Sequence, residues 1–350
     1  MSAVLLGLVT PHIRRTLRGW EFQEDFDRRV AIAEELNEAV RANDVALARR
    51  AIGAGANPNL DPRENLLNLC IVHGRVEMME LLLASGMAAE AGSLSYGNSP
   101  LYIAARSSPP DVRCQTIRIL VAAGADPRRQ DGHPPFTYMD IAFASSDAQT
   151  ADLLREYGLP YGPREMAGLN RLNDLKRAVE QSPEIVKERF RTRWAPAGQD
   201  PTLLAIAIER GHREMSRFLI ESGAPLDTVA YHGSTLLHLA AHGGDPELIR
   251  LLVAHGLDVN AVDGNSNTPL AAIAWSDKTQ AVAALLEAGS SANHRGWLGG
   301  TPLHSAGSGG QIKIVRMLLA ARADPALVDE QGKTPLDLAR TRKRTKGNLH

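Results

Sequence analysis

Histidine and cysteine are the residue types here that most often carry acid–base, nucleophilic or metal chemistry, and their spacing argues against the common sites. The two cysteines, Cys70 and Cys114, lie far apart and form no paired zinc-ligand motif. Neither a His-Glu-x-x-His motif nor a Gly-rich phosphate loop occurs. His238 and His304 stand out because they recur 66 residues apart, each three residues after a threonine. Serines and acidic residues form no ordered constellation with them, so we expect no enzymatic activity.

The segment around these histidines belongs to a sequence motif that occurs five times at a constant spacing. Five threonines stand 33 residues apart: Thr202, Thr235, Thr268, Thr301 and Thr334. Leu or Pro follows each one, and a glycine recurs 21 residues after three of them, at Gly223, Gly256 and Gly289. Threonine can cap the free N–H groups of a helix, Pro suits the first helical position, and glycine suits a left-handed helix end. A fixed period of this length indicates a stack of helical repeats.

The 33-residue period and the Thr-Pro-Leu-His-like start resemble the ankyrin repeat. The resemblance implies an all-α solenoid of stacked helix-turn-helix units with β-turn fingers. Looser copies upstream begin at three residues: Asn65, Ser99 and Thr137. We expect about nine repeats plus a terminal half-repeat, over residues 34–340. Arg322 occupies the position of the recurrent glycine in its repeat, which predicts either some backbone strain or a changed helix cap there.

The repeat register predicts five segments along the chain. They are an N-terminal helical cap or arm (1–33), N-terminal ankyrin repeats (34–160), a degenerate repeat with an irregular connection (161–200), regular C-terminal repeats (201–340) and a basic tail (341–350). We expect residues 1–33, which include Trp20, to cover the first repeat, with a partner-binding arm as the alternative. The basic and aromatic stretch 187–198 is expected to be a packed helix, with a binding loop as the alternative.

Composition and charge narrow the function classes. The formal net charge is −1, which gives no overall attraction to nucleic acid or membrane. The apolar start of the chain has no basic residue before it and is too short to span a bilayer. We expect both cysteines to be buried in a reducing compartment and the protein to be cytoplasmic and monomeric without its partner. The basic tail is expected to solvate the exposed end, with nuclear targeting or anionic-ligand binding as the alternative.

The resemblance also assigns candidate binding residues. In the ankyrin family, exposed slots lie four, three and one residues before the threonine and seven and eight after it, on a concave surface that usually binds another protein. The candidates in or near these slots are Tyr96, Arg106, Glu209, Arg210, Tyr231, His232, His242, Asn265, Asn267, Trp275, Trp297 and Leu298. Aromatic residues at successive exposed slots are typical of a binding hot spot, although each Trp could instead pack against its neighbouring repeat.

The function implied is non-enzymatic binding of another protein through the concave face and finger tips, with no cofactor or metal. The family places the histidine after Thr-Pro-Leu in a structural role, bonding backbone between neighbouring repeats. One alternative is a dedicated inhibitor or immunity protein that neutralises a bacterial toxin or enzyme, because the Ala- and Arg-rich, Lys-poor composition suggests a GC-rich bacterial genome. Another is a translocated effector that binds host proteins. Nucleic-acid binding is disfavoured by the near-neutral charge.

Overall fold

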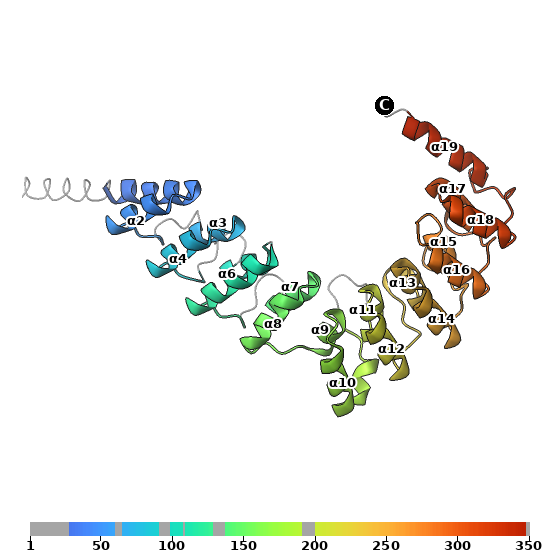
Figure 1. Cartoon of the computed structure of the whole chain (residues 1–350), viewed down its shortest axis with the longest axis horizontal. Helices are drawn as coiled ribbons and strands as arrows, with labels where there is room; N and C mark the ends of the chain where they lie inside the picture. Colours follow the sequence, from blue (N-terminus) through green and yellow to red (C-terminus); the bar gives the residue numbers. More distant parts are fainter. Residues whose placement is uncertain are drawn as a thin grey trace, which may run out of the picture. The chain divides into compact units, whose positions relative to one another are not determined.

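The computed structural model in Figure 1 describes residues 28–59, 65–90, 99–107, 109–128, 137–190 and 200–347. Within these ranges the regular structure is helical, and the only β pairing is two isolated bridges, Arg189 with Thr202 and Val229 with Thr235. The predicted all-α class is therefore confirmed. The chain forms two compact units, Met1–Pro160 and Tyr161–His350. Tyr96, most of the predicted N-terminal cap and residues 191–198 of the basic, aromatic stretch lie outside the described ranges.

Unit 1 stacks helix pairs in two layers. After a helix over residues 28–42, its helices are α2 (Val45–Gly53), α3 (Leu66–Val72), α4 (Val76–Ala84), α5 (Pro100–Arg106), α6 (Pro110–Ala122), α7 (Tyr138–Ala144) and α8 (Ala148–Glu156). The short inner helices α3, α5 and α7 contact one another in order, and in the outer layer α2 contacts α4 and α6 contacts α8. Leu67, Met78 and Ile117 are fully buried between the layers.

Unit 2 repeats the same two-layer arrangement with greater regularity. Its inner layer is α9 (Pro163–Gly168), α11 (Leu203–Glu209), α13 (Leu236–Gly243), α15 (Pro269–Ile273), α17 (Pro302–Gly309) and α19 (Pro335–Gly347), and its outer layer is α10 (Leu172–Gln181), α12 (Arg213–Glu221), α14 (Pro246–Ala254), α16 (Thr279–Glu287) and α18 (Ile312–Ala320). Successive inner helices contact one another along the whole row. Short 3₁₀ turns occur at Pro183–Lys187 (η2), Tyr231–Gly233 (η3) and Trp297–Gly299 (η4).

The helix boundaries follow the local signals in the sequence. The hydroxyl of Thr202 accepts a hydrogen bond from the Ala205 N–H at 3.2 Å, and Thr268 caps α15 in the same way. The recurrent glycines end outer helices with a positive φ, 82° at Gly223 and 88° at Gly256. Arg322 adopts the same left-handed conformation, with a φ of 62°. Because arginine has a Cβ, the backbone is strained there by about 1 kcal/mol, as predicted.

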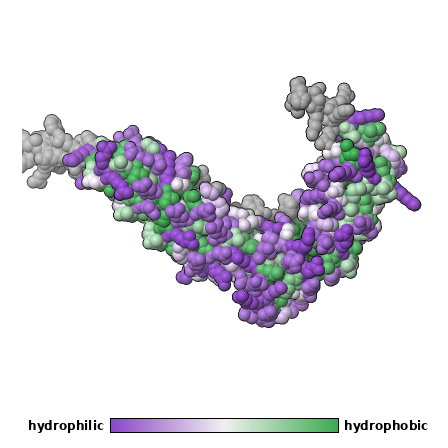
Figure 2. All heavy atoms as spheres, in the orientation of Figure 1, coloured by the Kyte–Doolittle hydropathy of each residue, from purple (hydrophilic) through white to green (hydrophobic). Residues whose placement is uncertain are grey.

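The last helix differs from the predicted layout. Residues 341–347, which the sequence assigned to a basic tail, continue α19 to Gly347. No helix of the described ranges is both long and apolar enough to cross a membrane. On the face shown in Figure 2, hydrophobic residues are interspersed among hydrophilic ones over both units.

Candidate functional site

Four hairpin turns, here called fingers, precede the last four inner helices of unit 2. They span residues 230–234, 263–267, 296–300 and 329–333. In each finger the first residue donates its N–H to the carbonyl of the last: Ala230 to Ser234 at 2.7 Å, Asp263 to Asn267 at 2.9 Å, Gly296 to Gly300 at 2.8 Å and Asp329 to Lys333 at 2.9 Å. The same closure at a constant spacing gives a row of similar turns.

The fingers are ordered internally in two different ways. In the second finger the Asp263 carboxylate accepts the N–H groups of Asn265 and Asn267, both at 2.9 Å. The first and third fingers have Ala230 and Gly296 at this position. There His232 and Leu298 adopt left-handed backbone conformations, with φ of 57° and 53°. Leucine rarely adopts this left-handed backbone conformation. In addition, 45% of Leu298 is exposed at the tip of its finger.

Hydrogen bonds also join each finger to the next. The Gly264 N–H donates to the His232 carbonyl at 2.7 Å, and the Glu330 N–H donates to the Leu298 carbonyl at 3.0 Å. Between them, the Trp297 N–H donates to the Asn267 side-chain oxygen at 3.1 Å. A Cβ on Gly264 would lie 2.7 Å from the His232 oxygen, so glycine is needed for this close approach. The four fingers therefore form one connected row.

His238 and His304 connect the inner helices to this row. Nδ1 of His238 accepts the Thr235 N–H at 3.2 Å, so the ring proton is on Nε2, which donates to the Asn267 carbonyl at 2.9 Å. His304 bonds the Thr301 N–H and the Lys333 carbonyl in the same way. Burial lowers the pKa of His238, which favours the neutral ring. Both ring nitrogens are engaged, as the resemblance predicts for a structural histidine.

Aspartate replaces this histidine in two repeats and accepts the same threonine N–H group. Asp140 accepts the Thr137 N–H at 2.9 Å and Asp337 accepts the Thr334 N–H at 3.1 Å. Hydrogen bonds from Thr334 lower the pKa of Asp337. An ionised carboxylate has no proton to donate to a carbonyl, so it cannot replace the bond that His238 donates to the next finger.

The two predicted tryptophans are exposed in unit 2. Trp275 follows α15 and is 59% exposed, and its Nε1–H donates to the Ala272 carbonyl at 2.9 Å. Trp297 lies in η4 and is 66% exposed. A Cβ on Gly309, in the next repeat, would lie 2.4 Å from the Trp275 carbonyl oxygen, so the next repeat approaches Trp275 without a side chain at this point. Neither tryptophan is a buried packing residue.

Most other predicted site residues are also accessible. His232, His242, Asn265 and Leu298 are exposed, and Asn267 is half-buried. Tyr231 begins η3. The slots of the three repeats that begin at Thr235, Thr268 and Thr301 contain no Asp, Glu, Lys or Arg. We call the exposed side chains of these slots the uncharged face: His232, His242, Asn265, Trp275, Trp297, Leu298 and Ser308.

The equivalent slots of the repeats that neighbour the uncharged face carry charged residues. Glu209 is exposed and Arg210 half-buried in the repeat before it, and Glu330 and Lys333 are exposed in the finger after it. Partial burial of the imidazole and the nearby Lys278 lower the pKa of His242, which favours the neutral ring. A charge-depleted, aromatic centre between polar and charged ends is the composition found at protein–protein interfaces.

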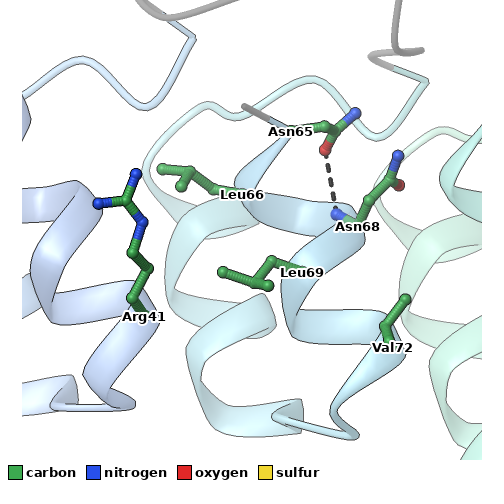
Figure 3. A pocket seen from close by; sticks show the side chains of 6 residues that line it. All are labelled: Arg41, Asn65, Leu66, Asn68, Leu69 and Val72. Carbon is green, nitrogen blue, oxygen red and sulfur yellow. Dashed lines mark hydrogen bonds between the residues drawn. The ribbon is translucent and has the colours of Figure 1, made fainter. Parts of the chain in front are cut away.

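Unit 1 offers a different surface. Arg106 is exposed, and its guanidinium lies 5.5 Å from the centroid of the Tyr102 ring. A groove of about 470 Å³ is lined by Arg41, Asn65, Leu66, Asn68, Leu69 and Val72, and Figure 3 shows these side chains. Val72 stands seven residues after Asn65, in the slot that Trp275 occupies in its own repeat. The slot pattern could have identified Val72, but the prediction did not include it.

The described ranges contain no group of three or more His, Cys, Asp or Glu side chains that could hold a metal ion. Burial raises the pKa of the Cys70 thiol to about 12, so this thiol stays protonated at neutral pH. Cys114 is buried as well, and both cysteines are free.

A family model described as "Ankyrin repeats (3 copies)" matches residues 36–131 and, in overlapping registers, 175–263, 204–296, 237–329 and 270–346. These ranges together cover more than half of the chain. The sequence matches no curated protein.

Proposed function

The chain belongs to the ankyrin-repeat family, and we propose that it binds another protein through the uncharged face of unit 2. Ankyrin repeats are generally protein–protein interaction modules and are typically non-enzymatic. The single observation that supports the choice of face is the pair of exposed tryptophans, Trp275 and Trp297, in a set of slots without charge. Tryptophan is the side chain most enriched at binding hot spots.

The exposed area of the two tryptophans is large enough to matter. At their exposed fractions of 59% and 66%, two indole side chains present roughly 250 Å² of surface, worth about 6 kcal/mol if it is fully buried. Association itself costs about 4–15 kcal/mol, so the tryptophans need further contacts from the fingers. The hydrogen bonds within and between fingers hold these groups in place before binding, which reduces the entropy lost on association.

The proposed role is that of a cytoplasmic adaptor or scaffold. The two cysteines, both free and buried, are consistent with a reducing compartment. An inhibitor or immunity role predicts that the partner is an enzyme whose activity falls on stoichiometric addition of this chain. An effector role predicts that the protein is found outside the cell that makes it. Identification of the partner distinguishes these roles.

The test is affinity capture of the tagged full chain from a lysate of the cell that makes it, followed by mass spectrometry. The Trp275→Ala/Trp297→Ala variant is compared with Ile312→Ala/Leu319→Ala, which removes two exposed apolar side chains from the outer helix α18. We expect one protein to be retained in near-stoichiometric amount by the wild type and the α18 variant, and to be absent from the tryptophan variant. Retention by all three would refute the assignment of the face, and a melting curve of each variant shows that folding is intact.

A further inference from the structure

Three side chains at the second and third fingers are held in contact with one another, and we call Asn267, Trp297 and Leu298 the third-finger patch. Trp297 is 66% exposed and Leu298 is 45% exposed. The Trp297 N–H donates to the Asn267 side-chain oxygen at 3.1 Å. A Cβ on Gly296 would lie 2.4 Å from the same oxygen. The Asn267 amide therefore lies directly against the backbone that carries the indole ring and Leu298.

The acceptor groups of the third-finger patch are already used within the chain. Three successive carbonyls accept backbone N–H groups: Gly296 from Gly299 at 2.9 Å, Trp297 from Gly300 at 3.1 Å and Leu298 from Glu330 at 3.0 Å. The Asn267 side-chain oxygen accepts the Trp297 N–H. The patch therefore has little acceptor capacity left for a ligand.

The side-chain donors of the patch, in contrast, are unused. The Trp297 Nε1–H makes no hydrogen bond with any residue in the described ranges, and neither does the side-chain NH₂ group of Asn267. Trp275 differs, because its Nε1–H already donates to the Ala272 carbonyl at 2.9 Å. An indole N–H can only donate, so it needs an acceptor when a ligand covers it.

The charges around the patch favour neither an acidic nor a basic ligand. The Asp263 carboxylate accepts two N–H groups of its own finger. Arg295 and Glu330 are both exposed and opposite in sign. A Cβ on Gly299 would lie 3.2 Å from each of these two side chains, so their charges offset each other beside the patch. An uncharged ligand with acceptor groups fits these surroundings.

We propose that the third-finger patch binds a proline-rich segment of the partner in the polyproline II conformation, and this proposal rests on the proposed function. Such a segment has no internal hydrogen bonds, so its carbonyls are free to accept from Trp297 Nε1–H and the Asn267 amide. Proline has no N–H that would need an acceptor on the patch. Its rings pack on the indole and on Leu298, and the preformed conformation keeps the entropy lost on binding low.

Other uncharged ligands satisfy the patch less well. The carbonyls of a helix are bonded within the helix, so a docked helix would bury the donors of Trp297 and Asn267 without an acceptor. An extended strand of other residues carries as many N–H groups as carbonyls, and the patch has few acceptors for them. The hydroxyls of an oligosaccharide are donors as well as acceptors and meet the same shortage.

The probe is a random peptide library, panned on the full chain at low salt, where charged peptides can compete. We expect the enriched peptides to be rich in proline and to carry no net charge. The affinity of a synthesised winner should fall about threefold to tenfold in Trp297→Phe, which keeps an aromatic ring but removes the unused N–H. It should fall further in Trp297→Ala.

The matched control is Trp275→Phe, which removes an N–H that is already bonded within the chain and should bind the peptide like the wild type. The affinity of the winner should also stay constant as salt is added, because no charge pair contributes to it. Melting curves of all variants verify folding.

The possible results separate the two proposals. The proline-rich proposal is overturned, and the proposed function stands, if the enriched peptides lack proline or carry a net charge. The same holds if Trp297→Phe binds the winner like the wild type, if no peptide is enriched, or if the neutral oligosaccharide cellohexaose binds more tightly than the best peptide. Retention of the partner captured from the lysate by Trp275→Ala/Trp297→Ala overturns the proposed function and this proposal with it.

Discussion

Both compact units join neighbouring outer helices by the same device, an arginine paired with the aspartate that caps the next outer helix. In unit 1 Arg113 of α6 pairs with Asp147, the N-cap of α8, and each side chain is only 8% exposed. In unit 2 Arg213 of α12 pairs with Asp245, the N-cap of α14, at 2.6 Å, with 47% and 18% exposed. The same link is thus buried in one unit and solvated in the other.

This difference shows that the two units depend on different interactions. In unit 1 the buried ion pair between Arg113 and Asp147 joins two neighbouring repeats. The Arg113 Nε–H also donates to the Ser107 carbonyl at 2.7 Å. In unit 2, the ring of His238 bonds a backbone carbonyl of the next finger, and backbone bonds join the fingers to one another. This bonding leaves Trp297 and Leu298 exposed on the fingers.

The largest effect is expected from breaking the buried pair. Asp147→Asn keeps a capping oxygen but leaves the Arg113 charge without its carboxylate, and we expect unit 1 to lose about 3–5 kcal/mol. The matched variant Asp245→Asn in unit 2 should have a far smaller effect because that pair is solvated. Urea denaturation of the full chain, with hydrogen exchange resolved by segment, measures both. Equal losses in the two variants would contradict the comparison.

The two cysteines provide an independent readout, because Cys70 and Cys114 both lie in unit 1. A thiol reagent should not label the native chain at neutral pH, since both thiols are buried and the pKa of Cys70 is about 12. Labelling should become faster in Asp147→Asn and stay unchanged in Asp245→Asn. Rapid labelling of the wild type would show that unit 1 opens readily without any mutation.

As the pH falls, the two units should lose stability in different pH ranges. Burial alone would raise the pKa of Asp147, but hydrogen bonds from Thr150 and pairing with Arg113 lower it overall. Its stabilisation is therefore present above the unfolded pKa of about 3.9 and is lost as pH falls through the lowered folded value. The pKa of His238 is also lowered, so its contribution is present above about pH 6.5 and is lost as pH falls from there.

A smaller effect, about 1–3 kcal/mol, is expected from His238→Ala, which removes the bonds to Thr235 and Asn267. Hydrogen exchange should rise in α13 and α15 but not in unit 1. The variant should also lose part of the stability change that unit 2 shows between about pH 7 and pH 5.5. An unchanged pH profile would show that His238 does not control it.

A still smaller effect of opposite sign is expected at Leu298. Leu298→Gly relieves the left-handed strain at φ 53° and should stabilise the third finger by at most about 1 kcal/mol, less the entropy that glycine adds to the unfolded chain. The melting temperature measures this change. If Leu298 also contacts the partner, the same variant binds more weakly although it is no less stable. A clear loss of stability would mean that the leucine side chain packs in the native state.

Much of the fold could be predicted because its signals are local and repeated. Thr202, Gly223 and their equivalents mark where helices begin and end, and a constant period places the fingers and slots. The Arg113–Asp147 pair could not be predicted, because two charges 34 residues apart carry no local pairing signal. Leu298 in a left-handed turn was missed for a similar reason, since leucine has no preference for that conformation.

The candidate face was predicted as a set of positions, but its exposure was not. The sequence left Trp275 and Trp297 open to packing against a neighbouring repeat. The structure shows both exposed. The charge-free slots followed from the sequence, whereas the extension of α19 beyond the repeat did not.

The central claim is that the uncharged face of unit 2 carries binding and contributes little to stability. The most direct measurement is calorimetric titration of the captured partner with the wild type and with Trp275→Ala/Trp297→Ala, together with a melting curve of each. We predict that the double variant loses at least about 100-fold in affinity while its free energy of unfolding changes by less than about 0.5 kcal/mol. An affinity close to that of the wild type would contradict the account.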